Sequence, residues 1–281
     1  MIIGINGYSG SGKDTIGKLI QILTCPKIPD NYDVLELITF YDTQHEWWLE
    51  EESGWEIKKW AGKLKTIASL LTGIPIRKFE DQEFKKSYLP EQWNYWTVSV
   101  ISDGNKLLFQ QGRFVSKAEA EEYIPLLKQN YEGLQLEYVV GMQQMTVRQF
   151  LQELGTDACR NGLHPNTWVN ALMADYKSEY EVIYDSQKTS NPLPVKEPTN
   201  ELGQNPNWII TDTRFPNEAQ AIKDAGGIVI RVDRPGVRAI NAHPSETGLD
   251  NWDFDHKIMN GSDLVSLMFS VNTILKKQNL L

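Results

Sequence analysis

The 281-residue sequence has little of what marks secreted proteins, zinc-cluster proteins or membrane proteins. It contains only two cysteines, Cys25 and Cys159, and four histidines. The two cysteines lack metal-ligand spacing and exclude a disulfide framework, so they indicate a reduced cytosolic interior. No apolar run approaches the roughly 20 residues needed to span a bilayer, and the chain begins with an apolar strand rather than a basic leader. We therefore expect a soluble, cytoplasmic protein with no membrane partner.

Positive charge is also scarce. Lys and Arg number 28 against 37 Asp and Glu, which gives a formal net charge of −9 and a pI near 5.1. A protein that binds a nucleic-acid polymer needs a basic stripe on its surface, so such a polymer is excluded as the main partner. A nucleotide monomer is not excluded, because a few local Arg and Lys side chains can meet its charges. The composition, 41% hydrophobic and 23% charged, is that of a globular protein with ample core.

The most specific motif lies at the N-terminus. An apolar strand over 1–5 precedes residues 7–15, which read G-Y-S-G-S-G-K-D-T, and apolar residues then return at helical spacing from Ile16. A strand, a glycine loop and a helix in this order form the setting of a phosphate-binding P-loop. Backbone N–H groups and the helix dipole attract phosphate oxygens, while Lys13 reaches the outer phosphates. The predicted nucleotide-binding residues are Gly10, Ser11, Gly12, Lys13, Asp14 and Thr15.

Asp14 departs from the common form of this loop. It occupies the place where Ser or Thr usually supplies a hydroxyl to Mg²⁺, and Thr15 follows it. Two metal-side roles are open for Asp14: an outer-shell ligand of Mg²⁺, or a carboxylate that faces the acceptor phosphate through that ion. The alternative is an acid in the first helical turn, which the helix dipole favours.

A second candidate element lies in the last third of the chain. Residues 208–212 read Trp-Ile-Ile-Thr-Asp, an apolar strand that ends in the carboxylate of Asp212. In a P-loop fold such a strand is a Walker B element, whose acid faces the metal ion and the phosphates. Arg214 and Glu218 follow where a loop and a helix start leave the strand, so acid, base and acid are expected to converge. The alternative is a structural Arg–Glu pair that fixes the loop.

An arginine cluster follows the next strand, which we expect over 228–233. Arg231, Arg234 and Arg238 occur within one short segment. Guanidinium groups at this density suit the charge of a transferring phosphoryl group, and we include Arg234 among the candidate catalytic residues. A solvated surface is the alternative interpretation.

Apolar periodicity predicts further elements around these sites. We expect a strand over 34–41, helices that begin near Trp60 and Pro165, a helix over 145–158 and a closing helix over 263–277.

Two segments interrupt this pattern. Residues 90–141 are rich in aromatic and β-branched side chains and carry turn and helix-cap signals, so they predict a small β-rich insertion with a helix from Ser116. Residues 185–206 contain several Pro, Asn, Ser and Lys with almost no apolar periodicity, and they predict a mobile loop. We expect a single α/β domain over 1–281 that carries both excursions.

Six blocks, spread in order over nearly the whole chain, carry a resemblance to a known family. They are the P-loop that ends Gly-Lys-Asp-Thr at 12–15, Leu-Thr-Gly-Ile-Pro at 71–75 with Phe84 and Lys85, residues 151–160, Trp168 with Val169, residues 212–218, and His-Pro-Ser-Glu at 243–246 with Asp255 and 258–260. Together they resemble the deoxynucleoside monophosphate kinases of tailed bacteriophages. The match fails only over 42–56, 90–141 and 185–206.

This resemblance implies a P-loop NTPase fold, in which a mainly parallel central sheet lies between two helical layers. It implies transfer of the γ-phosphoryl group of ATP to a deoxynucleoside 5′-monophosphate, with Mg²⁺ bridging the ATP phosphates, in the cytoplasm of a host cell. The catalytic residues are then expected to be Lys13, Asp212 and Arg214, together with Arg234 from the arginine cluster, and the metal-side residues Asp14 and Thr15.

The resemblance also implies a monophosphate site. Its expected residues are Lys85, Gly155, Thr156, Arg160, Trp168, Asp212, Arg214 and Glu218. Trp168 is expected to stack on the base, an interaction worth ~1–3 kcal/mol, and a core tryptophan is the alternative. Lys85 could equally lie on a solvated helix face, and Arg160 could bind the terminal carbonyls of its helix. Gln82 stands where the family pattern has an arginine, and Arg77, Lys78 or Lys85 are the candidates to replace it.

Two other functions stay open. A P-loop kinase of another small metabolite is the second hypothesis, and a nucleotide-binding scaffold without transfer activity is the third. The acidic surface and apolar closing helix are compatible with either a monomer or a homodimer.

Overall fold

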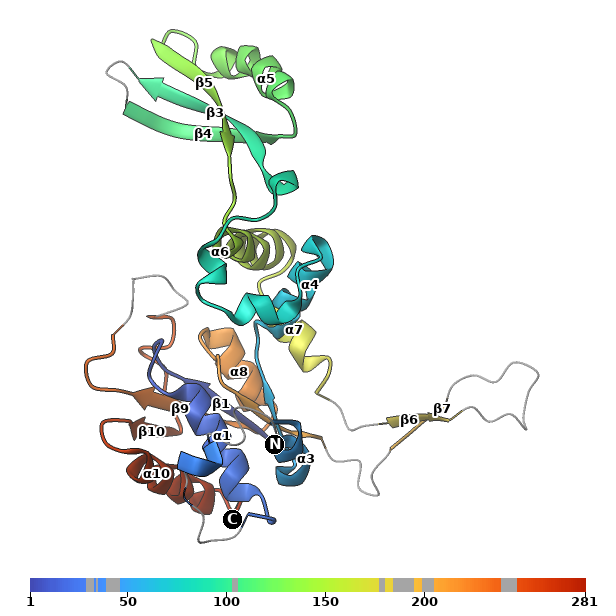
Figure 1. Cartoon of the computed structure of the whole chain (residues 1–281), viewed down its shortest axis with the longest axis vertical. Helices are drawn as coiled ribbons and strands as arrows, with labels where there is room; N and C mark the ends of the chain where they lie inside the picture. Colours follow the sequence, from blue (N-terminus) through green and yellow to red (C-terminus); the bar gives the residue numbers. More distant parts are fainter. Residues whose placement is uncertain are drawn as a thin grey trace, which may run out of the picture. The chain divides into compact units, whose positions relative to one another are not determined.

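The computed structural model describes residues 1–28, 33, 35–38, 46–102, 106–176, 180–183, 195–198, 205–238 and 247–281 (Figure 1). The chain divides into two compact units. The first unit comprises Met1–Lys63 and Pro165–Leu281, and the second comprises Leu64–His164. Each unit is described by itself.

A five-stranded sheet forms the centre of the first unit. Its order is β10 (His256–Met259), β9 (Ile228–Asp233), β1 (Ile2–Asn6), β8 (Asn207–Ile210) and β2 (Trp55–Lys58). Every neighbouring pair is parallel. The carboxyl ends of all five strands therefore lie at one edge of the sheet, where open α/β sheets bind their ligands.

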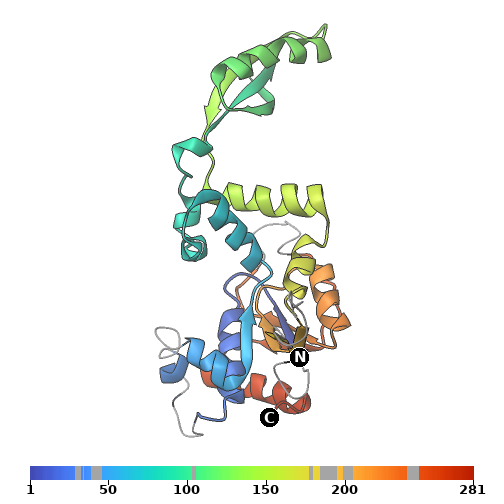
Figure 2. The same ribbon diagram turned by 90° about the vertical axis from the view of Figure 1, so that its right-hand side faces the viewer.

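Helices cover both faces of this sheet, as Figure 2 shows. Helices α1 (Lys13–Thr24) and α10 (Leu264–Lys277) pack on the face that carries Ile3 and Ile5, while α7 (Thr167–Met173) and α8 (Pro216–Asp224) pack on the face that carries Ile2. Successive side chains of a strand point to opposite faces, so a strand buried on both sides must be apolar throughout, as β1 is. The predicted three-layer α/β fold with a mainly parallel sheet is confirmed.

The second unit contains a smaller, antiparallel sheet. Its order is β4 (Lys106–Phe114), β3 (Tyr95–Ser102) and β5 (Leu136–Gln143). Helix α5 (Lys117–Asn130) packs on one face and begins at Ser116, whose Oγ accepts a hydrogen bond from the backbone N–H of Glu119 at 3.2 Å. A small β-rich subdomain is therefore present, as the sequence predicted, and its last strand ends at Gln143, two residues beyond the predicted 90–141.

Helices make up the rest of the second unit. They are α4 (Gly62–Thr72, which begins in the first unit), the 3₁₀ turns η1 (Ile76–Glu80), η2 (Phe84–Lys86) and η3 (Glu91–Trp93), α6 (Val147–Gln152) and the π-helix η4 (Glu153–Leu163). Helices α6 and η4 continue one another, which matches the helix predicted over 145–158.

Some expectations differ from the structure. Residues 35–38 are helical, so the strand expected over 34–41 is wrong at these positions, and the other residues of that strand, 34 and 39–41, lie outside the described residues. Helix α3 (Glu46–Ser53) and strand β2 were not predicted. Within the expected loop over 185–206, Val195–Pro198 forms strand β7, paired with β6 (Tyr180–Ile183), and most other residues of this loop are not described. Across the described ranges, no helix is both long and apolar enough to span a membrane.

Candidate phosphate-binding site

The glycine loop leaves the carboxyl end of β1 and enters α1, as predicted. Gly10 and Gly12 have φ of 81° and 97°, in the left-handed region that glycine adopts without steric cost. Lys13 is the first residue of α1, and its Nζ donates to the carbonyl oxygens of Gly7 and Tyr8, both at 2.7 Å. The lysine is therefore held over its own loop, beside the N-terminus of a helix that favours anions.

Two neighbouring strand ends hold the loop from outside. Asn260, just after β10, donates from Nδ2 to the carbonyl oxygen of Ser11 at 2.8 Å. Arg234, just after β9, donates from Nη1 to the carbonyl oxygen of Gly10 at 3.1 Å. The predicted catalytic residue Arg234 thus touches the loop that the sequence assigned to phosphate binding.

Asp14 faces the end of β8 and the connection after β2. Its Oδ1 accepts a hydrogen bond from Thr211 Oγ1 at 2.7 Å and lies 3.4 Å from Lys59 Nζ. Burial acts to raise the pKa of Asp14, but the Thr211 bond and the charges of Lys59 and Lys13 outweigh it, so the pKa is lowered. Asp14 is therefore a carboxylate at neutral pH, the form that a magnesium ion requires. Thr15 follows it on α1 and is half-buried.

Asp212 follows β8 and binds the connection between β2 and α4. Its Oδ1 accepts from the backbone N–H of Trp60 at 2.8 Å, and its Oδ2 accepts from that of Ala61 at 3.2 Å. Burial raises the pKa of Asp212, although both hydrogen bonds and the charges of Arg214 and Lys59 oppose this shift. Asp212 therefore fixes the segment that carries Lys59 beside Asp14.

Glu218 stabilises the start of helix α8. It is 2% exposed, and its Oε2 accepts from the backbone N–H groups of Arg214 at 2.8 Å and Phe215 at 3.1 Å. With Pro216 in the first turn, this helix start has one half of a capping box, the bond from the N-cap backbone N–H of Phe215 to the Glu218 carboxylate, because a phenylalanine side chain cannot accept the reciprocal bond. The side chain of Arg214 is exposed. Glu218 thus holds the backbone from which the Arg214 side chain projects, at the same sheet edge as Asp212.

Trp168 lies on α7 and is 5% exposed. The helix follows Asn166, whose Oδ1 accepts a hydrogen bond from Asn217 Nδ2 at 2.8 Å. This bond ties the start of α7 to the first turn of α8. The stacking role of Trp168 stays a prediction.

Four predicted monophosphate-site residues belong to the second unit. Lys85 lies in η2, and Gly155, Thr156 and Arg160 lie in the π-helix η4. A π-helical segment inside a helix often marks a functional site. Gly155 is buried, and a Cβ at this position would lie 2.9 Å from Cδ2 of Leu64, so glycine lets α4 pack closely on η4.

Gln82, at the place where the family pattern has an arginine, has a basic neighbour. Arg148 Nη2 donates to Gln82 Oε1 at 3.3 Å. Arg148 is the second residue of α6, and the sequence pattern did not single it out beside Arg77, Lys78 and Lys85. It joins them as a candidate for the missing positive charge.

The three clustered arginines have different surroundings. Arg231 is 8% exposed and bonds to Asn6, Asp233 and Asp250, whereas Arg234 and Arg238 are exposed. The expectation that the cluster acts together on phosphate is therefore not met by Arg231, because β9 is buried on both faces and turns this side chain into the protein.

Several site residues were missed by sequence reasoning. They are Asn6, Lys59 and Thr211, and each ends a parallel strand or follows one directly. That position is itself a usable signal, since ligands of open α/β sheets bind at the carboxyl ends of the strands. Lys59 could not be found in this way, because strand β2 was not predicted.

Comparison with known proteins bears on the predicted family. A family model described as deoxynucleotide monophosphate kinase matches residues 94–271. The deoxynucleotide monophosphate kinase of Enterobacteria phage T4 is 30% identical over 133 residues, which are 47% of this chain and 46% of that protein. A putative deoxynucleotide monophosphate kinase of Acanthamoeba polyphaga mimivirus is 33% identical over 111 residues, 37% of this chain and 47% of that protein.

The match to these two relatives thus spans about half of their length. The deoxynucleoside-5′-monophosphate kinase of Escherichia phage T5 is 23% identical over 279 residues, which are 94% of this chain and 90% of that protein. The family model covers more than half of the chain and confirms the resemblance. It contains four of the six sequence blocks, and it also spans 94–141 and 185–206, where no match was expected. This chain belongs to the deoxynucleotide monophosphate kinase family.

Proposed function

We propose that this chain transfers the γ-phosphoryl group of ATP to a deoxynucleoside 5′-monophosphate, so that the products are ADP and the deoxynucleoside diphosphate. The observation that carries the proposal is the arrangement at the carboxyl edge of the parallel sheet. Lys13 sits on the glycine loop, Arg234 touches that loop, and the ionised Asp14 lies beside it. Family membership supports the same reaction.

The loop fits the phosphates of a nucleotide. Ser11 is 1% exposed, and its buried Oγ, near Gly7, has no hydrogen-bond partner among the residues that the structure describes. Such an orphaned hydroxyl calls for a further polar partner, which a phosphate oxygen supplies. No atom of the described residues, other than those of its chain neighbours, lies within 4 Å of the Cβ position of Gly10. Gly10, Ser11, Gly12, Lys13, Asp14 and Thr15 are proposed to hold the ATP phosphates.

A magnesium ion also fits this edge. No group of three or more His, Cys, Asp or Glu that could hold a metal ion occurs among the residues that the structure describes. Mg²⁺ in phosphoryl-transfer sites takes most of its ligands from phosphates and water, with one or two from protein. Asp14 and Thr15 would hold the ion, directly or through water. When bound, the ion neutralises charge on the phosphate oxygens.

In this mechanism the protein positions the phosphates and stabilises their charge. The bond between the γ-phosphorus and its bridging oxygen breaks, and a phosphate oxygen of the monophosphate forms the new bond, so no covalent protein intermediate is needed. Lys13, Arg214 and Arg234 would stabilise the negative charge of the transferring group. The acceptor phosphate is a dianion that needs little help from a base, and Asp212 is assigned to the metal or acceptor side.

We propose that the acceptor is held by the residues that the family resemblance implies. In the first unit these residues are Trp168, Asp212, Arg214 and Glu218. The resemblance also implies Lys85, Gly155, Thr156 and Arg160, which belong to the second unit. Glu218 acts through the backbone of Arg214, to which its carboxylate is bonded. The single kinase domain with its insertion over 90–141 is part of this proposal.

A coupled ADP-release assay tests the reaction. It contains ATP, Mg²⁺ and each deoxynucleoside monophosphate in turn, with the matching ribonucleotides as controls for sugar selectivity and the Lys13→Ala protein as a blank. ADP release that depends on a deoxynucleotide supports the proposal. If no nucleotide stimulates ADP release from protein that still binds ATP, the result would favour a different acceptor or a non-catalytic role.

A further inference from the structure

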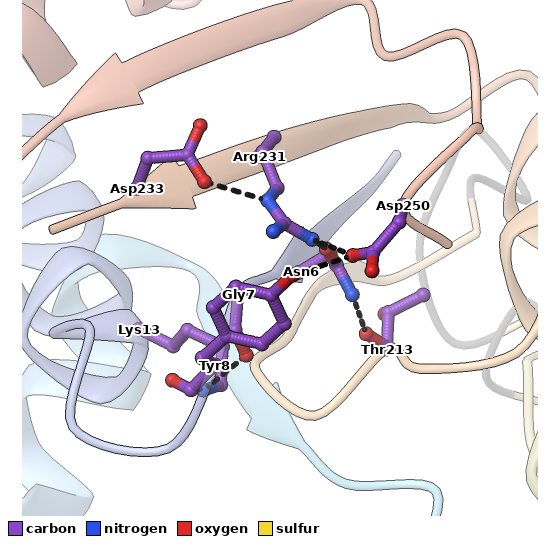
Figure 3. A network of polar contacts seen from close by, with 8 residues as sticks. All are labelled: Asn6, Gly7, Tyr8, Lys13, Thr213, Arg231, Asp233 and Asp250. Carbon is purple, nitrogen blue, oxygen red and sulfur yellow. Dashed lines mark hydrogen bonds and ion pairs between the residues drawn. The ribbon is translucent and has the colours of Figure 1, made fainter. Parts of the chain in front are cut away.

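A buried arginine lies directly behind the P-loop. Arg231 is 8% exposed on β9, in register with Asn6 of β1. Its Nε donates to Asp233 Oδ1 at 2.8 Å, and its Nη1 donates to Asn6 Oδ1 at 2.6 Å and to Asp250 Oδ1 at 3.4 Å (Figure 3). Burying a charge is costly even when it is paired, so stability alone does not explain this arginine. Its planar fork of donors is suited to fixing several segments in one geometry.

The first segment that it fixes is the P-loop. The guanidinium carbon of Arg231 lies 4.6 Å from the centroid of the Tyr8 ring, a cation–π contact. Tyr8 Oη donates to Asp250 Oδ1 at 2.8 Å, so Arg231 and Asp250 both contact the Tyr8 side chain (Figure 3). The carbonyl oxygen of Tyr8 is one of the two that accept from Lys13 Nζ. Tyr8 thus connects the buried arginine to the lysine of the loop.

The second segment is the loop that follows Asp212. Asn6 is 5% exposed and is bonded at both ends of its amide. Its Oδ1 accepts from Arg231, and its Nδ2 donates to the carbonyl oxygen of Thr213 at 2.8 Å. Thr213 directly follows Asp212 in the chain. The side-chain amide of Asn6 therefore connects Arg231 to the backbone beside Asp212.

We propose that Arg231, Asn6, Tyr8 and Asp250 form a positioning cluster for phosphoryl transfer. The cluster holds the carbonyl groups that bind Lys13, and the loop beside Asp212, in fixed positions before substrates bind. This inference rests on the proposed function and adds to it residues that position the proposed catalytic groups Lys13 and Asp212. Dipoles and charges that are already in place need no rearrangement during the reaction. The cluster would contribute to the rate by keeping these groups in place.

Two substitutions test the cluster with little disturbance. Tyr8→Phe keeps the ring under Arg231 and removes only the hydroxyl that binds Asp250, and Arg231→Lys keeps the charge but loses the planar fork. Each should lower kcat by about 10- to 100-fold through misplacement of the loop. The KM for the monophosphate should stay within about twofold of that of the unchanged protein, because these residues do not bind the substrate in its ground state.

The matched control is Arg113→Lys. Arg113 lies in the second unit, with its guanidinium carbon 4.6 Å from the Tyr95 ring centroid and its Nη1 2.6 Å from Glu153 Oε2. The Arg113→Lys variant therefore loses the same kind of cation–π contact and ion pair as the Arg231→Lys variant does. Its kcat should remain that of the unchanged protein.

Amide hydrogen exchange gives a readout that needs no turnover. Without substrates, the amides of residues 7–12 should exchange faster in Tyr8→Phe and in Arg231→Lys, while those of residues 95–102 should not change. Exchange at 7–12 equal to that of the unchanged protein, with full kcat, would overturn the inference, even if the unfolding midpoint falls. Failure of the unchanged protein to turn over would refute the proposed function, and hydrogen exchange would still decide on the cluster.

Discussion

Replacing Gly12 with alanine should destabilise the folded protein through two separate effects. Gly12 has a φ of 97°, and a left-handed backbone costs a non-glycine residue roughly 1–2 kcal/mol. A Cβ at this position would lie 2.5 Å from Asn260 Nδ2, so Asn260 must move and give up its bond to the Ser11 carbonyl. The loss of that bond adds about 0.5–1.5 kcal/mol. The expected total is about 1.5–3.5 kcal/mol.

The matched control is Gly10→Ala. Gly10 has a φ of 81°, but within the described part of the chain no side chain other than those of its chain neighbours lies within 4 Å of its Cβ position. Its alanine variant should therefore show only the backbone cost of roughly 1–2 kcal/mol. Urea unfolding of both variants measures the difference, provided that the slope with denaturant stays the same.

A double variant isolates the collision. In Gly12→Ala with Asn260→Ala the side chain that obstructs the new methyl group is gone, so the two substitutions should cost less together than the sum of their separate effects. Equal destabilisation by Gly12→Ala and Gly10→Ala would refute the reasoning, since it would mean that Asn260 does not lie against the loop.

Three further predictions concern the proposed reaction. Lys13→Ala should abolish ADP release while circular dichroism and urea unfolding show a retained fold, and measurable turnover would remove the P-loop lysine from the mechanism. Trp168→Ala should mainly raise the KM for the monophosphate, because base stacking is worth ~1–3 kcal/mol, whereas an unchanged KM with lost stability would identify a core tryptophan. Burial raises the pKa of Asp212 in the folded protein. As the pH rises from about 4, the ordinary carboxyl value, through the folded pKa, ionisation of Asp212 therefore lowers the free energy of unfolding. Urea unfolding at pH 4.5 and 7.5 should therefore show Asp212→Asn gaining stability relative to the unchanged protein at the higher pH, and a difference that does not vary with pH would contradict this assignment.

Local sequence signals predicted the elements that build the site's centre. Strand β1, the glycine loop and α1 are adjacent in the chain, and strand, turn and helix signals there agree. Strand β9 occupies the predicted 228–233, because an apolar run between Gly227 and Asp233 is a strong strand signal. Glu218 was placed correctly at a helix start, where its carboxylate accepts hydrogen bonds from the backbone N–H groups of Arg214 and Phe215.

Other parts of the site depend on contacts that no local pattern encodes. Residues 35–38 are helical although the segment is apolar and β-branched, since a short apolar run does not distinguish a strand from a buried helix. Strand β2 has only four residues, two of them charged, and its register comes from pairing with β8. The partners of Arg231 come from β1, from β9 itself and from the segment at Asp250, so only the folded sheet brings them together.

The most direct test of the central claim follows the phosphoryl group itself. ATP labelled with ³²P at the γ-position is incubated with Mg²⁺, the protein and each deoxynucleoside monophosphate, and the products are separated by thin-layer chromatography. The account predicts label in a deoxynucleoside diphosphate, in amounts beyond one turnover, and none with Lys13→Ala. Label that appears only as inorganic phosphate, or remains in ATP with every deoxynucleotide, would contradict it.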